Sequence, residues 1–113
     1  HTLGNVYILE YLDELGLKGK IIDDYSEMEL VSREPAYVDD SYAFFSLINI
    51  TGIARGITIE NAKYPLNNGE ITCSYQYGVS NEVLSGKRAK ISIKDGKVLL
   101  IKDYKRPSIS ASL

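Results

Sequence analysis

Tryptophan is missing from this chain, and cysteine, histidine and methionine occur once each. A single cysteine, Cys73, excludes an internal disulfide, which is typical of proteins kept in a reducing compartment. One cysteine and one histidine also exclude a zinc cluster of the Cys/His type. Neither a Walker-type phosphate loop nor a Gly-x-Ser-x-Gly nucleophile elbow occurs. These absences predict a cytoplasmic protein and point to no metal ligands in this chain.

The chain also has little excess of one charge over the other and no long hydrophobic run. The 13 basic and 15 acidic residues give a formal net charge of −2. Nucleic acids and anionic membranes are bound mainly by lysine and arginine, so this balance argues against a general surface for either. No apolar run approaches the roughly 20 residues that cross a bilayer. The sequence therefore predicts neither a nucleic acid nor a membrane as partner.

The residues that are present describe an ordinary globular domain rich in tyrosine. The 113 residues are 44% apolar and 25% charged, which suits one domain with its own core. Nine tyrosines stand against two phenylalanines. Tyrosine is frequent in half-buried strands, where its ring packs and its hydroxyl reaches a polar partner. Composition alone therefore favours a β-rich fold.

An amphipathic helix is predicted at the very start, in HTLGNVYILEYLDELG. Apolar residues recur there at three- and four-residue intervals, and Gly16 stands where a helix C-cap is expected. The predicted apolar face consists of Leu3, Val6, Tyr7, Leu9, Leu12 and Leu15. Because the chain starts on this helix without a methionine, we expect it to be cut from a longer protein.

Short strands with frequent turn signals fill the rest of the chain. The pattern predicts strands around residues 28–31, 36–38, 42–48, 53–59 and 70–78, and a pair of alternating strands within residues 89–103. Asn67–Gly69 indicates a turn, Gly52 and Gly56 indicate bulges or bends, and Asp95-Gly96 indicates the turn of a hairpin. The pattern predicts a mostly β protein: an antiparallel β-sandwich, jelly-roll-like, preceded by one N-terminal helix.

The reactive side chains are few and lie in ordinary surroundings. Cys73 falls in an alternating strand, which favours a packed small apolar residue over a nucleophile. The pairs Asp23-Asp24 and Asp39-Asp40 lie beside turns. Neighbours on a strand point to opposite faces, so solvated turn carboxylates are favoured over metal ligands at both pairs.

The stretch from Lys63 to Glu82, KYPLNNGEITCSYQYGVSNE, carries the least ordinary pattern. Gly78 allows a close backbone approach, and Ser80 and Asn81 place a hydroxyl beside an amide. Two interpretations stay open. The residues are either turn chemistry that ends a strand or a site for a planar heterocycle, held by hydrogen bonds beside a tyrosine face.

Three parts of the chain resemble the thiamine pyrophosphokinase family, in the family's order. HTLGN resembles the end of its Gly-Gly-Arg-x-Asp-His-x-x-x-Asn signature. KYPLNNGEIT with YGVSNEV resembles its Tyr-Pro-Leu and Gly-x-Ser-Asn-Glu segments, and AKISIKDGKVLLI is similar to its last hairpin. The resemblance runs from His1 to roughly Lys102.

The resemblance implies one half of a two-domain transferase. Members of the family bind ATP and Mg²⁺ in an amino-terminal α/β domain and thiamine in a carboxy-terminal β-sandwich, as homodimers with active sites between subunits. They transfer pyrophosphate from ATP to thiamine, which gives AMP and thiamine diphosphate. Residues 1–16 are then expected to be the end of the catalytic domain or the domain junction, 17–104 the thiamine-binding sandwich and 105–113 a loosely held tail.

Thiamine-binding residues follow from the same resemblance. Ser80 and Asn81, with backbone groups near Gly78, are expected to bind the pyrimidine of thiamine. Tyr64 stands where some relatives carry tryptophan, so it is expected to pack on a ring of the substrate. The plainer alternative for Tyr64 is ordinary loop packing.

Catalysis is expected to need more than this chain. His1 and Asn5 lie one helical turn apart and are expected to face the catalytic cleft, the plainer alternative for His1 being a frayed end. The aspartate expected before His1 and the upstream acidic clusters are absent, so we expect these residues alone not to catalyse pyrophosphoryl transfer. Two other functions stay open: a stand-alone β-sandwich that binds a small ligand or carbohydrate, and a structural dimerisation domain.

Overall fold

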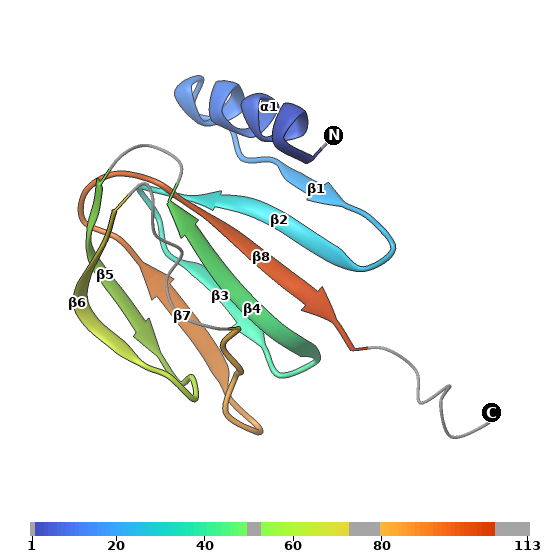
Figure 1. The fold of residues 1–113 in the computed structure, drawn as a ribbon, viewed down its shortest axis with the longest axis vertical. Helices are drawn as coiled ribbons and strands as arrows, with labels where there is room; N and C mark the ends of the chain where they lie inside the picture. Colours follow the sequence, from blue (N-terminus) through green and yellow to red (C-terminus); the bar gives the residue numbers. More distant parts are fainter. Residues whose placement is uncertain (1, 50–52, 73–79, 106–113) are drawn as a thin grey trace.

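The computed structural model describes residues 2–49, 53–72 and 80–105, and in them one helix precedes eight strands (Figure 1). The mostly β fold with one leading helix confirms the predicted fold class. No helix in these ranges has the length and apolar character needed to cross a membrane. The elements are α1 (Thr2–Glu14), β1 (Lys20–Ile22), β2 (Ser26–Val31), β3 (Ala36–Asp39), β4 (Tyr42–Asn49), β5 (Ile53–Glu60), β6 (Leu66–Thr72), β7 (Arg88–Ser92) and β8 (Val98–Tyr104).

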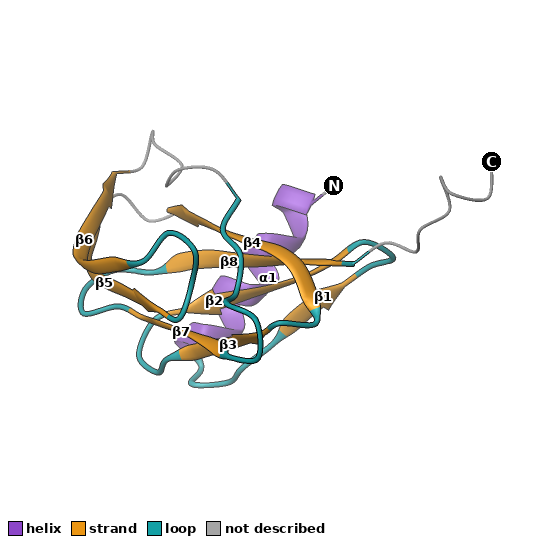
Figure 2. Cartoon of the chain, turned by 90° about the horizontal axis from the view of Figure 1, so that it is seen from below, coloured by secondary structure: helices purple, strands orange, loops and turns teal. Residues whose placement is uncertain are grey.

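The strands form two four-stranded antiparallel sheets that face each other. The first sheet has the order β1-β2-β8-β4 and the second has the order β3-β7-β5-β6. In Figure 2, β4 and β8 lie in one layer and β3 and β7 in the other. Alternate residues of both sheets point inward and fill the space between them. The largest fully buried side chains there are Val31, Val38, Phe45, Leu47, Ile57, Ile59, Ile91, Val98 and Leu100.

The helix covers the outer face of the first sheet. Leu9 is buried against Met28 of β2 and Leu99 of β8. This cover explains why Val98, Leu99 and Leu100 are all buried, although successive strand residues point to opposite faces. The predicted apolar face of the helix extends too far, because Leu15 is 56% exposed.

The end of the helix confirms the predicted C-cap. Gly16 has a φ of 78°, in the left-handed region that glycine adopts most easily. The amide of Gly16 donates to the carbonyl of Asp13 at 2.9 Å, and the amide of Leu17 donates to that of Leu12 at 2.8 Å. These two bonds are those of a Schellman motif. Leu15 therefore lies beyond the last residue that packs on the sheet.

Asp13 fastens the end of the helix to two other segments. Its carboxylate accepts a hydrogen bond from Ser32 at 2.9 Å and forms ion pairs with Arg33 at 3.2 Å and Lys97 at 2.8 Å. Burial by itself would raise the pKa of Asp13. The contacts with Lys97 and Ser32 and the charges of Lys97 and Arg33 outweigh burial, and they hold the pKa below its ordinary value.

We expect Asp13→Asn to lower the free energy of unfolding by about 1 kcal/mol at pH 7. Because the pKa of Asp13 is lowered from an ordinary 3.8, its contribution is complete above that value and is lost as the pH falls through the folded pKa. Urea unfolding of the wild type and Asp13→Asn should give a difference in stability that is full at pH 7 and smaller at pH 3. Glu14→Gln on the same helix is the control, and an equal loss there would contradict this role.

The predicted turn at Asn67–Gly69 is wrong, because these residues lie inside β6. The pairing of β5 with β6 shifts register twice, so that Ile57 faces Gly69 and Ile59 faces Leu66. Asn68 has a φ of 55°, and a Cβ on Gly69 would lie only 2.5 Å from the Leu66 side chain. Glycine and asparagine serve here to bend a strand, not to end it. Gly56 lies at the first register shift, which confirms a bulge at that glycine.

The predicted hairpin at Asp95-Gly96 is also wrong. β7 pairs with β3 and β5 in the second sheet, whereas β8 pairs with β2 and β4 in the first. The turn therefore carries the chain from one sheet to the other. The amide of Arg55 donates to the carbonyl of Asp95 at 2.9 Å, so the turn is attached to β5. By contrast, Asp23 is a turn carboxylate as predicted, accepting the amides of Tyr25 and Ser26 at 2.7 and 2.8 Å.

Candidate functional site

The structure brings two of the predicted site residues into direct contact. Tyr64 lies in the connection between β5 and β6, and Asn81 lies in the segment that precedes β7. Ser80 is exposed next to Asn81. Asn5 lies within α1, which packs on β1 and β2. His1, Gly78 and Cys73 fall outside the described residues.

Asn81 uses its side chain to hold the backbone of Tyr64. Only 3% of Asn81 is exposed. Its Oδ1 accepts the amides of Tyr64 and Glu82, each at 2.9 Å, and its Nδ2 donates to the carbonyl of Tyr64 at 2.8 Å. A buried amide keeps such bonds because an unpaired polar group would be costly. The predicted contact of Asn81 with a pyrimidine stays a prediction.

The backbone of the same segment connects the two sheets. Asn81 exchanges both backbone hydrogen bonds with Phe45 of β4, at 2.7 and 2.9 Å. Beyond it, the amide of Lys63 donates to the carbonyl of Glu82 at 2.8 Å. Phe45 belongs to the first sheet, whereas Lys63 follows β5 of the second. The segment therefore fixes Tyr64 on a backbone frame that both sheets support.

Exposed groups surround this frame. Tyr64 is 44% exposed. The Lys63 ammonium lies 5.5 Å from the centre of the Tyr64 ring and 3.6 Å from the Glu82 carboxylate. With the hydroxyl of Ser80, the surface offers an aromatic face, a carboxylate and a hydrogen-bonding group. This is the chemistry expected of a site for a planar, positively charged heterocycle.

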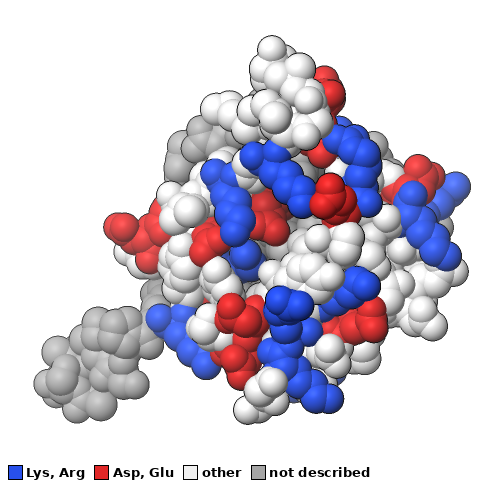
Figure 3. All heavy atoms as spheres, turned by 180° about the vertical axis from the view of Figure 1, so that it is seen from behind, with Lys and Arg blue, Asp and Glu red and all other residues white. Residues whose placement is uncertain are grey.

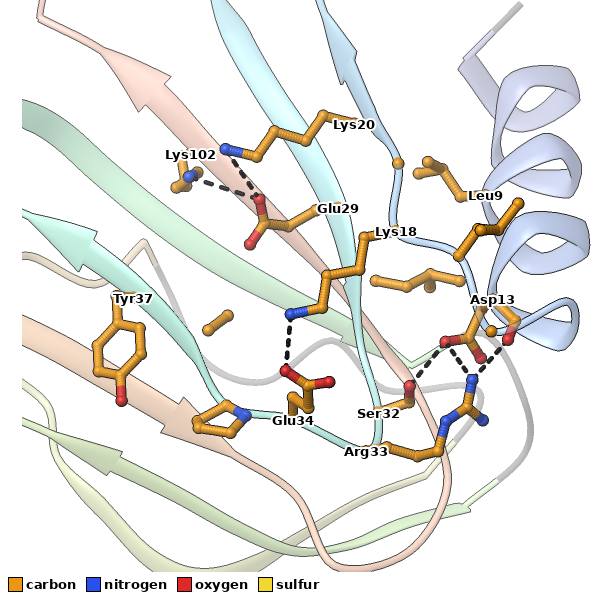
Figure 4. A pocket seen from close by; sticks show the side chains of 16 residues that line it. Leu9, Asp13, Lys18, Lys20, Glu29, Ser32, Arg33, Glu34, Tyr37 and Lys102 are labelled. Atoms are coloured by element: carbon orange, nitrogen blue, oxygen red, sulfur yellow. Dashed lines mark hydrogen bonds and ion pairs between the residues drawn. The ribbon is translucent and has the colours of Figure 1, made fainter.

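A cavity of about 530 Å³ lies elsewhere, between the end of α1, β2 and the start of β3 (Figure 4). Of the predicted site residues that the structure describes, none lines it. Its wall carries the exposed ion pair of Lys18 and Glu34 at 2.9 Å, and behind it lie Glu29, Lys20 and Lys102. The sequence did not predict this cavity, because its lining comes from segments that are far apart in the chain.

Three of the residues that line the cavity, Lys20, Glu29 and Lys102, belong to a network of charged side chains. The side chain of Lys102 is 5% exposed, and its ammonium is 3.6 Å from both Glu27 and Glu29. Lys20 approaches the same two carboxylates at 3.4 and 3.6 Å, and the Tyr42 hydroxyl donates to Glu27 at 2.6 Å. Each of the four strands of the first sheet supplies at least one member of this network.

Hydrogen bonding and nearby charge favour the ionised form of Glu27. The hydrogen bond from Tyr42 is the main cause that lowers the pKa of Glu27; burial opposes it, and the charges of Lys102 and Lys20 add to it. Burial and the hydrogen bond to Glu27 raise the pKa of Tyr42. On the face shown in Figure 3, basic and acidic side chains are interleaved without a large area of one sign. The network is balanced internally, which suits a structural role.

The acidic side chains of the described residues do not gather into a metal site. Within the described ranges, no group of three or more His, Cys, Asp or Glu side chains is placed to hold a metal ion. The residues described here therefore do not fit a Mg²⁺ site, and no chemical step is assigned to one.

Comparison with known proteins points to one family. The family model described as "Thiamin pyrophosphokinase, vitamin B1 binding domain" matches residues 31–98, a range that contains Tyr64, Ser80 and Asn81. The thiamine pyrophosphokinase of Bacillus subtilis (strain 168) is 26% identical over 104 residues, which are 90% of this chain and 48% of that protein. The chain thus spans about half the length of the curated relative that it matches.

Solved structures agree with the sequence comparison. The crystal structure of thiamine pyrophosphokinase from Bacillus subtilis has a TM-score of 0.83 at 25% identity, covering 94% of this chain and 50% of that one. Thiamin pyrophosphokinase from Candida albicans has a TM-score of 0.74 at 13% identity, covering 92% and 39%. The second likeness is one of fold alone.

Proposed function

The chain belongs to the family of the thiamin pyrophosphokinase vitamin B1 binding domain, and from this membership we propose that it is the thiamine-binding part of a thiamine diphosphokinase. The parent enzyme would transfer pyrophosphate from ATP to thiamine and release AMP. The observation that carries the proposal is the family match over residues 31–98, which includes the segment that frames Tyr64. Residues 17–104 would be the thiamine-binding sandwich.

The proposed roles follow the chemistry of thiamine. Its aminopyrimidine needs a matched set of donors and acceptors, which Ser80 and the backbone near Gly78 would supply. Its thiazolium ring is a flat cation, for which the face of Tyr64 is suitable. Asn81 would position Tyr64, because its three side-chain hydrogen bonds hold the backbone of Tyr64 and Glu82 in place.

The remaining parts of the reaction are proposed to depend mainly on a further domain of the parent enzyme. ATP and Mg²⁺ would be held mainly by an acidic α/β domain, and His1 and Asn5 would face that domain's cleft. A homodimer would place the sandwich of one subunit against the catalytic domain of its partner. Mg²⁺, when bound, neutralises charge on the pyrophosphoryl group that is transferred.

A hybrid enzyme tests this function. We would replace the matching half of the Bacillus subtilis enzyme with this chain and measure AMP formed from ATP, Mg²⁺ and thiamine. The hybrid should turn over, and this chain alone should form no AMP. Ser80→Ala in the hybrid should raise the KM for thiamine about tenfold, the loss of one hydrogen bond to a polar ligand, and leave the KM for ATP within a factor of about two.

Several results would contradict the proposal. Equal rises of both KM values would remove Ser80 from the thiamine site. AMP formation by this chain alone at the hybrid's rate would place catalysis within it. If the hybrid does not fold, thiamine can be titrated into the isolated chain while the NMR shifts of the Tyr64 and Glu82 amides are followed. No shift at high thiamine concentration would count against the site.

A further inference from the structure

A positive charge already lies against the ring of Tyr64. The Lys63 ammonium is 5.5 Å from the ring centre, within the range of a cation–π interaction. The same ammonium is 3.6 Å from the Glu82 carboxylate. An aromatic face and a carboxylate thus share one cation, and that cation comes from the neighbouring residue in the chain.

The backbone that carries the two groups receiving the cation is firmly held. One buried oxygen, Oδ1 of Asn81, accepts the backbone amides of both Tyr64 and Glu82. Lys63 has a flexible four-carbon stem, and its side chain is 55% exposed. An exposed ion pair contributes little to stability, so moving the ammonium away costs little. The ring and the carboxylate therefore extend from a fixed backbone, and Lys63 is a replaceable occupant of the space beside them.

We propose that Tyr64 and Glu82 form a site for an organic cation, which Lys63 fills until a ligand cation takes its place. For the identity of that cation the inference rests on the proposed function, which makes it the thiazolium of thiamine. Glu82 is then a specificity residue, since it favours a charged ring over a neutral one of the same shape. Lys63 opposes binding, because its ammonium must leave and then repels the incoming charge.

The charge requirement is tested with two small probes of nearly equal shape. One is the neutral 5-(2-hydroxyethyl)-4-methylthiazole, and the other is its N-methylated thiazolium. Lys63→Met should tighten binding of the thiazolium about threefold, and Glu82→Gln should weaken it about threefold, the range expected for exposed cation–π contacts and ion pairs. The neutral probe should show neither change. NMR shifts of the Tyr64 and Glu82 amides give the dissociation constants.

A second exposed ion pair provides matched controls. Lys18 and Glu34 lie 2.9 Å apart with side chains 76% and 68% exposed, and neither contacts the frame around Tyr64. Lys18→Met and Glu34→Gln make the same changes of net charge, so they report any effect of overall charge. Both should leave the affinity for the thiazolium unchanged.

The outcomes separate this inference from the proposed function. Weaker or unchanged thiazolium binding in Lys63→Met, or equal effects on both probes, overturns the cation site while thiamine binding stands. Suppose that the thiazolium binds more tightly to Lys63→Met and more weakly to Glu82→Gln, but that thiamine binds no more tightly than the thiazolium. This result supports the cation site and contradicts thiamine as its ligand. A wild-type chain that binds none of the three compounds overturns both.

Discussion

Lys102→Met is expected to lower the free energy of unfolding by about 3 kcal/mol, the loss typical of a buried ion pair that keeps only one partner. The ammonium of Lys102 is the innermost cation between Glu27 and Glu29, with 5% of its side chain exposed. Without it, Oε2 of Glu29 keeps only Lys20 nearby, and this oxygen is buried without a hydrogen bond. Urea unfolding followed by tyrosine fluorescence measures the loss.

Two further variants test the explanation. Lys20→Met removes a cation from the same carboxylates, but the Lys20 side chain is 51% exposed, so a loss below about 1 kcal/mol is expected. In the double variant Lys102→Met/Glu29→Leu the Glu29 carboxylate is gone, and Glu27 keeps Lys20 and the hydrogen bond from Tyr42, so part of the stability should return. Equal losses for the two lysine variants, or no recovery in the double variant, would show that burial does not control the contribution of Lys102.

Acid should weaken the same network. The pKa of Glu27 is lowered from its ordinary 4.5, so its contribution to stability is complete above that value and is lost as the pH falls through the folded pKa. The difference between the wild type and Lys102→Met should therefore narrow below about pH 4. Tyr42 titrates far above this range and stays a hydrogen-bond donor to Glu27 throughout.

The fold class could be predicted because burial follows local pattern. In β4 the alternate residues Phe45, Leu47 and Asn49 are buried, and in β3 the alternate residues Ala36 and Val38 are buried. Period-two alternation indicates a half-buried strand wherever one face meets a core. The end of the helix at Gly16 could likewise be predicted, since a left-handed C-cap depends on one residue type at the helix end.

The arrangement of strands could not be predicted from local pattern. Asp-Gly favours a tight turn, and a turn does occur between β7 and β8. Whether the next strand pairs with the previous one or crosses to the facing sheet depends on which core each apolar face joins. Ile91 and Val98 both point into the space between the sheets, from opposite sides. The turn predicted at Asn67–Gly69 was wrong for a related reason, because asparagine and glycine also occur in β-bulges.

The sequence did not predict the buried charges, because alternation of polar and apolar residues does not say which face of a strand meets water. Glu27 and Glu29 alternate with Met28 and Leu30, which predicts a strand with its polar face in water. The helix instead covers the face of Met28, and the carboxylates point to the inner side, where Lys102 meets them. Only the lysine within the apolar run of β8 hinted at a buried partner, and its partner is remote in sequence.

The candidate site was predicted in its residue types but not in its connections. Tyr64 and Asn81 were both chosen from motifs, yet the hydrogen bonds that join them span 17 residues. No periodicity reports a contact of that separation. The role of Glu82 was also missed, because a glutamate after Ser80-Asn81 is ordinary turn chemistry until Lys63 and Tyr64 are seen beside it.

Asn81→Ala is expected to weaken thiamine binding more than tenfold and to lower the free energy of unfolding by about 2 kcal/mol. The change removes the partner of the Tyr64 amide, the Tyr64 carbonyl and the Glu82 amide, at a position only 3% exposed. The ring and the carboxylate then lose the frame that holds them beside each other. Thiamine titration and urea unfolding of the same protein measure the two effects.

Asn81→Asp provides the comparison, because it keeps the acceptor, removes the donor and adds a negative charge. Its carboxylate can still accept the amides of Tyr64 and Glu82, but it faces the Tyr64 carbonyl with an oxygen where Nδ2 donated at 2.8 Å. Binding and stability should fall between those of the wild type and Asn81→Ala. If Asn81→Ala loses stability and keeps full affinity for thiamine, the frame serves the fold and not the ligand. If Asp and Ala lose affinity equally, while the Tyr64 and Glu82 amide signals keep their wild-type shifts in Asp, the amide group itself contacts thiamine, because only a direct contact would depend on the donor alone.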